Sequence, residues 1–244
     1  MRPLPAVLLV VLVALVAASP AQEKKPAASV SISGTVTLKG KAPARKRIRL
    51  DADPKCVQLH PEPMLSEDVL VDASNHLQWA FVYVKAGLGD AKRPDAPKAP
   101  VVLDQRGCRY EPRVMGVRVG QDFLIRCSDE LLHIVHAIPR ANQEWGFSQQ
   151  EKGRERTKVF TAPEIMVPIK CDVHLWMKAW VGVLDHPWFA VTDASGRFEI
   201  KDLPPGKYTL EAWHEACKPV TLEVEVKEGA VAAVVADFEL ATGR

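Results

Sequence analysis

Several side chains of this sequence combine sulfur and nitrogen metal donors at short spacing. The heptapeptide Cys171-Asp-Val-His-Leu-Trp-Met177 contains a thiol, an imidazole and a thioether. Two more imidazoles lie upstream in the apolar stretch His133-Ile-Val-His136. A thiolate and two imidazoles form a trigonal ligand set that suits copper, with a thioether as a long axial ligand. The sequence therefore predicts a copper site made by Cys171, His174, Met177 and one upstream histidine.

The strand before the heptapeptide should direct its cysteine inward. Val167, Ile169 and Cys171 lie on the same face of this strand, because side chains alternate between faces. Burial raises the pKa of a thiol, and a bound metal compensates by taking the thiolate. By the same alternation His133 and His136 face opposite sides, so only one of them can join the site.

The cysteine count leaves other interpretations open. Five cysteines are an odd number for a disulfide-bonded protein, which fits one thiolate reserved for a metal. The remaining four allow three connectivities, of which we favour Cys56–Cys108, because both lie beside proline-rich turns. Cys127 is alternatively a small buried hydrophobe. Without a metal, Cys171 would pair with Cys127 or Cys217. Zinc is a weaker candidate than copper, since methionine is a poor zinc ligand.

The elements that must position these residues are β-strands. Apolar residues recur with a period of two, and turn residues separate the runs, which predicts an all-β sandwich or barrel. Residues 89–100 have the composition of a linker. The expected strands lie within residues 31–40, 77–87, 114–127, 131–138, 164–171, 179–185, 188–200, 206–213, 219–226 and 232–240.

The last third of the chain carries a recognisable strand-and-turn pattern. Residues 192–213, "TDASGRFEIKDLPPGKYTLEAW", place one turn at Asp-x-x-Gly and another at Pro-Pro-Gly. This pattern resembles the carboxypeptidase regulatory-like (transthyretin-like) β-sandwich. The resemblance implies opening strands far upstream, at residues 34–36 and 81–84. We therefore expect a discontinuous sandwich, residues 28–97 and 188–242, with residues 98–187 inserted in it or joined to it.

The inserted segment resembles a second family. Residues 110–135, "YEPRVMGVRVGQDFLIRCSDELLHIV", and the Cys-x2-His-x2-Met loop resemble cupredoxins, the blue copper proteins such as plastocyanin and amicyanin. The resemblance implies a Greek-key copper domain over residues 98–187. It also implies the ligands His133, Cys171, His174 and Met177, with His136 as the alternative to His133. Together the two halves resemble exported proteins labelled methylamine utilization protein.

Two positions depart from the cupredoxin pattern. Ile134 and Cys127 stand where the family has asparagines. Losing the asparagine amides removes hydrogen bonds that would brace the ligand loop and the ligand sulfur. We still expect copper to bind, and the reduction potential is the property that these two replacements leave open.

The N-terminus predicts export. Residues 1–21 are predicted to be a signal peptide, because the positively charged Arg2 is followed by an apolar run over residues 4–18 and then by small residues up to Ala21. The alternative is an uncleaved membrane anchor. We expect a periplasmic or secreted protein without stable membrane insertion after cleavage. The formal net charge of +2 offers no electrostatic case for binding nucleic acid. Hydrolase and phosphate-loop motifs do not occur in the sequence, so we do not expect an enzyme.

These features lead to one functional expectation and one rival. The first is an exported mononuclear copper protein that transfers single electrons, with one ion cycling between Cu(I) and Cu(II) and a redox partner protein. Leu175 and Trp176 would then surround a solvent-facing edge of His174. The rival is a copper carrier, or a non-redox binding or interaction module built on the β-sandwich.

Overall fold

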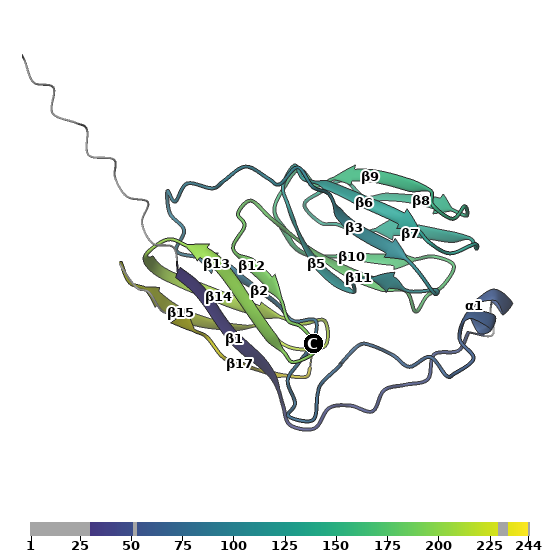
Figure 1. Ribbon diagram of the computed structural model, residues 1–244, viewed down its shortest axis with the longest axis horizontal. Helices are drawn as coiled ribbons and strands as arrows, with labels where there is room; N and C mark the ends of the chain where they lie inside the picture. Colours follow the sequence, from purple (N-terminus) through teal and green to yellow (C-terminus); the bar gives the residue numbers. More distant parts are fainter. Residues whose placement is uncertain (1–29, 51–52, 229–233, 244) are drawn as a thin grey trace, which may run out of the picture.

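The regular structure of this chain is almost entirely β. A computed structural model describes residues 30–50, 53–228 and 234–243, and within them four sheets accompany one short helix. Figure 1 shows the sheets as two bodies side by side, which confirms the all-β class. Among the described residues no helix is long and apolar enough to cross a membrane. The expected signal peptide, residues 1–21, lies outside the described part.

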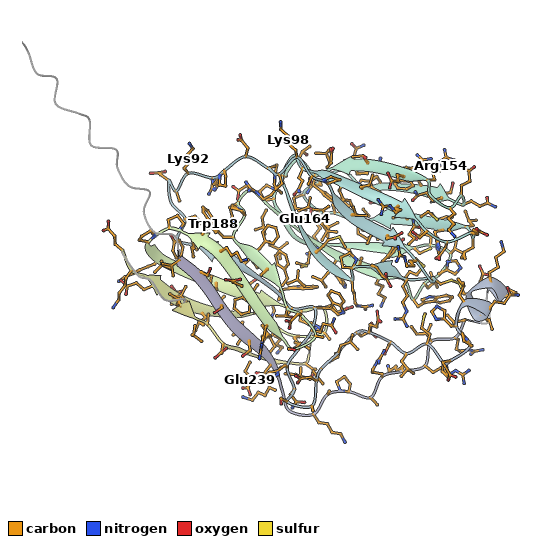
Figure 2. The ribbon with its side chains drawn as sticks, in the orientation of Figure 1. Lys92, Lys98, Arg154, Glu164, Trp188 and Glu239 are labelled. Atoms are coloured by element: carbon orange, nitrogen blue, oxygen red, sulfur yellow. A yellow bond between two sulfur atoms is a disulfide. The ribbon has the colours of Figure 1, made fainter. Side chains whose placement is uncertain are left out.

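The first body is a sandwich made from both ends of the chain. Its strands are β1 (Val30–Lys39), β2 (Phe81–Ala86), β12 (Phe189–Val191), β13 (Arg197–Leu203), β14 (Gly206–Trp213), β15 (Val220–Val226), β16 (Val234–Val235) and β17 (Phe238–Ala241). One sheet has the order β13-β1-β16, with β17 also paired to β1, and the other has the order β12-β2-β14-β15. Alternate residues of β1, such as Ile32 and Val36, fill the core between them together with Leu210. Trp188, which Figure 2 labels, belongs to the same core.

The second body is a sandwich made from the middle of the chain. Its strands are β3 (Val101–Gln105), β4 (Tyr110–Glu111), β5 (Val114–Arg118), β6 (Asp122–Cys127), β7 (His133–Ala137), β8 (Trp145–Gln149), β9 (Glu155–Val159), β10 (Glu164–Cys171) and β11 (Lys178–Leu184). The sheets have the orders β5-β11-β10-β7-β8 and β4-β3-β6-β9. Phe123, Ile125, Val167 and Ile169 are fully or almost fully buried in the core between them. Because all of these strands lie between residues 101 and 184, we propose that residues 98–187 form one domain, as the sequence predicts.

Two paired glycines let the bodies meet closely. Gly116 of β5 and Gly182 of β11 are register partners. A Cβ at Gly116 would lie 2.1 Å from the ring of Phe189, and one at Gly182 would lie 2.5 Å from the ring of Phe81. These two rings belong to the first body and stack with centroids 5.5 Å apart. Because neither glycine has a side chain, β5 and β11 leave room here for the two rings of the first body.

A long excursion between β1 and β2 reaches the far end of the second body. Figure 1 shows it running from the end of β1 to helix α1 (Pro54–Leu59) and back. We name residues 46–66 the capping loop; residues 51 and 52 lie outside the described part. Its two arms pair between Arg47 and Leu65, and Cys56 forms the predicted disulfide with Cys108 of the second body. This loop, although it lies within residues 28–97, therefore packs on the middle segment of the chain.

Candidate metal centre

Three of the predicted ligands meet at one end of the second sandwich. Cys171 ends β10 and His133 begins β7, the strand paired with β10, while His174 lies in the turn between β10 and β11. The Cys171 Sγ atom lies 3.8 Å from His174 Nδ1 and 4.0 Å from His133 Nδ1. The two Nδ1 atoms are 3.1 Å apart. All three side chains are buried, so the cluster is closed to bulk water.

Main-chain hydrogen bonds give the turn after Cys171 its shape. The His174 N–H donates to Cys171 Sγ at 3.3 Å, and the Met177 N–H donates to the His174 carbonyl oxygen at 2.9 Å. The Cys171 N–H donates to the Met177 carbonyl oxygen at 3.2 Å. Met177 is buried in the same apolar core as Cys171. Because its backbone is held within this turn, Met177 remains our candidate for the weak fourth ligand.

His136 lies outside the cluster. Its Nδ1 is 3.0 Å from Asp172 Oδ2 and its Nε2 is 2.7 Å from Glu144 Oε1, at a partly exposed position. His133, in contrast, is fully buried. This is the consequence of strand alternation, since the two histidines are three positions apart and their side chains therefore leave opposite faces of β7.

The histidines control the acidity of the buried thiol. Burial on its own would raise the pKa of Cys171, but its contacts with the His133 and His174 imidazoles and with backbone groups lower this pKa to about 6. One of these backbone contacts involves Ile134. The sulfur is thus braced by main-chain groups, although residue 134 itself has no amide side chain. The site favours a thiolate, the form that binds metals.

Each of the two histidines places its other nitrogen against a carboxylate. His133 Nε2 lies 3.1 Å from Asp129 Oδ2, and Asp129 also accepts from the backbone N–H groups of Gly107 and Cys108. His174 Nε2 lies 3.0 Å from Asp53 Oδ2. Burial lowers the histidine pKa values, but Asp129 and Asp53, together with the Cys171 sulfur, raise them above the ordinary value.

These carboxylates were missing from the predicted site. Asp129 stands only four positions before His133, so the sequence could have suggested it as a partner of this histidine. Asp53 lies 121 residues from His174, and nothing in its local sequence connects the two.

The expectation of a solvent-facing edge on His174 was wrong. Only 1% of His174 is exposed, because the capping loop and Trp176 cover it. The Trp176 ring centroid is 5.2 Å from that of His174, and its indole N–H donates to the Cys108 carbonyl oxygen at 2.9 Å. The sulfurs of the Cys56–Cys108 disulfide and a ring nitrogen of His174 lie within 4.8 Å of one another. Leu175 alone of these neighbours projects outward, at 73% exposed.

The donor set fits copper. Three donors that each lie about 2.0–2.3 Å from one ion are separated from each other by roughly 3–4 Å. The three separations here span 3.1 to 4.0 Å. One acidic thiol and two imidazoles with carboxylates on their far nitrogens are the ligand types that copper binds with thiolate coordination. Within the described residues, this cluster is the one metal-ligand group that contains a free cysteine.

The C-terminal strands match a known family. Residues 181–241 match the model of the carboxypeptidase regulatory-like domain. This confirms the resemblance predicted from the two turns of residues 192–213. No curated protein sequence matches the chain.

Solved structures similar to the chain include several cupredoxins. A mutant of amicyanin in the Cu(I) state is 19% identical with a TM-score of 0.31, covering 42% of this chain and 97% of that one. A purple cupredoxin from Nitrosopumilus maritimus is 17% identical with a TM-score of 0.30, covering 35% and 98%. A copper-containing nitrite reductase from Thermus scotoductus SA-01 is 18% identical with a TM-score of 0.33; the match covers 40% of this chain but only 25% of the reductase. These likenesses concern the fold alone.

Proposed function

We propose that this chain is an exported copper protein that transfers single electrons. His133, Cys171 and His174 would hold one ion, and Met177 would be a weak fourth ligand. The observation that carries the proposal is the convergence of an acidic buried thiol and two imidazoles within 4.0 Å of the sulfur. Copper, when bound, supplies the couple between Cu(I) and Cu(II).

The protein's part is to keep the ligands in place through both oxidation states. Cys171 and His133 lie on adjacent strands of one sheet, and His174 is fixed by its backbone contact to the sulfur. Burial of all three keeps water away from the ligand atoms. A rigid, dry site needs little rearrangement when the charge changes, which suits an electron carrier.

The wider setting of the proposal follows from the sequence. We propose a periplasmic or secreted location, a redox partner protein, and a role as a carrier of electrons instead of an enzyme. The rival functions, copper carriage and a non-redox binding module, would use the same ligands or the first sandwich.

A pair of cysteine variants tests the site. Purified protein loaded with Cu(II) should show an intense thiolate-to-copper absorption in the visible range. The Cys171→Ser variant should lose this absorption and Cys127→Ser should retain it, because Cys127 is also buried and free but lies outside the cluster. A Cys171→Ser protein that kept the colour would refute the assignment.

The two histidines of β7 provide the matched test for the nitrogen ligands. His133→Gln should weaken Cu(II) binding by at least about 100-fold, whereas His136→Gln should bind as the native protein does. Reversible voltammetry of the native protein would support electron transfer. A site that binds only Cu(I) and does not cycle would favour the carrier.

A further inference from the structure

The Nε2 atom of His174, which faces away from Cys171, contacts a residue far upstream in the sequence. Asp53 Oδ2 lies 3.0 Å from His174 Nε2, and the two residues are 121 positions apart. We propose that Asp53 is a positioning residue for the metal ligand His174, delivered by the capping loop. This inference rests on the proposed function, because it assigns Asp53 a role towards the same copper site.

The capping loop holds the Asp53 carboxylate in one orientation. Asp53 is the N-cap of α1, and its Oδ1 accepts from the Lys55 N–H at 2.9 Å while Oδ2 faces His174. Pro54 at the first helical position stabilises the start of the helix. Each carboxylate oxygen therefore has a separate partner, and the helix start sets the direction in which Oδ2 points.

Two further contacts fasten this helix to the metal end of the second body. The Cys56–Cys108 disulfide joins its first turn to the loop that also binds Asp129. The Lys55 Nζ group donates to the Glu130 carbonyl oxygen at 3.0 Å. The two residues that follow Pro54 are therefore each fastened to the second body, and they hold the start of the helix, with Asp53, beside His174.

The contact has a defined chemical effect on His174. When Nε2–H donates to the carboxylate, Nδ1 keeps its lone pair, and Nδ1 is the nitrogen that faces Cys171. The carboxylate also increases the basicity of the imidazole, which strengthens the binding of Cu(II) more than that of Cu(I). Asp129 does the same for His133, so the two histidines carry matched carboxylates from different segments.

The decisive variants separate charge from contact. Asp53→Asn keeps the N-cap and an acceptor oxygen but removes the charge, and Asp53→Ala removes both. Glu62→Gln changes an exposed carboxylate of the same loop and is the control for net charge. We expect Asp53→Ala to lower Cu(II) affinity by about 10–100-fold and Cu(I) affinity by less. A tenfold loss confined to Cu(II) raises the reduction potential by about 59 mV. Asp53→Asn should show a smaller change in the same direction, and Glu62→Gln none.

A measurement on the metal-free protein makes the inference independent of copper. In ¹⁵N spectra of the histidines, the native protein should show His174 protonated at Nε2, and Asp53→Ala should show faster exchange of this proton and a growing Nδ1–H form. If the native protein binds no copper, the proposed function fails while these spectra still decide the role of Asp53. A folded Asp53→Ala protein with native spectra, and with native affinity and potential where copper binds, would overturn the inference.

Discussion

Neighbouring groups, more than residue type, decide how the buried ionisable side chains behave. Cys127 and Cys171 are both buried in the second sandwich. Burial raises the pKa of Cys127, whereas two imidazoles outweigh burial at Cys171 and lower its pKa to about 6. Only the second thiol is prepared to bind a metal as a thiolate.

His186 shows the same principle at the junction of the two bodies. It is buried, it accepts a hydrogen bond at Nδ1 from the Trp188 N–H, and its ring stacks on that of Trp188. Burial lowers the pKa of His186 from 6.5 to about 4. The folded protein therefore holds this imidazole neutral under conditions in which an unfolded chain would protonate it.

We predict that His186 makes the protein less stable in mild acid. As pH falls from about 6.5 to about 4, His186 becomes protonated in the unfolded state but stays neutral in the folded state. The free energy of unfolding therefore falls by at most about 3 kcal/mol over this range. The contribution is constant above and below this window. His186→Asn, which retains an acceptor near Trp188, should flatten the profile measured by urea unfolding at several pH values. Equal slopes in the two proteins would contradict the prediction.

At the level of elements, the capping loop is the part that local patterns describe least well. The sequence has no long apolar periodicity between residues 40 and 76, and α1 has six residues. The loop keeps its place through the disulfide and through packing of Leu50, Cys56 and Met64 against Cys108 and Leu131. Its order is thus a property of contacts with the second body.

We predict that removing the disulfide loosens the cap. Cys56 and Cys108 are separated by 52 residues, and closing a loop of this length in the unfolded chain corresponds to about 4 kcal/mol, with measured losses of roughly 2–5 kcal/mol. The double variant Cys56→Ser/Cys108→Ser should lose stability in this range in denaturant unfolding. It should also shift the copper potential in the same direction as Asp53→Ala, since Asp53 loses its anchor. A native potential in the double variant would show that the disulfide does not position Asp53.

At the level of the whole molecule, the two sandwiches are joined by close packing that depends on glycine. Phe81 is fully buried at the junction and Phe189 lies beside it, both against the faces of β5 and β11. Gly116 and Gly182 have ordinary negative φ angles or extended backbones, so their value here is the space that they leave. This contact fixes how the two bodies meet.

We predict that a single methyl group disturbs the junction. Gly182→Ala would place Cβ against the buried ring of Phe81, and overpacking of this kind costs roughly 1–3 kcal/mol. Gly146→Ala on β8 is the matched control, because its Cβ would meet its nearest atoms at 3.6 Å, an ordinary contact. The control should be neutral or stabilising by up to about 1 kcal/mol. Comparable unfolding midpoints for the two variants would mean that the junction yields freely.

Much of the fold follows from the sequence because alternation and turn chemistry are local. The predicted turn at Asp193–Gly196 is present: the Gly196 N–H donates to the Asp193 carbonyl oxygen at 3.0 Å, and Gly196 has φ +66°. The strands β3, β4, β8 and β9 were not predicted. β9 is largely exposed, so its residues lack the apolar alternation that marks a half-buried strand.

The all-β class, the two turns of the C-terminal strands and the candidate ligands could be predicted from the sequence, because they depend on spacing along the chain and on which strand face a residue occupies. The packing in three dimensions was needed to show that His174 is covered, that Asp53 contacts it, and that Gly116 and Gly182 make room for the rings of Phe81 and Phe189. Each of these contacts joins segments that are far apart in the sequence. Such contacts depend on how whole sheets and loops pack together, and the local residue pattern does not specify that packing.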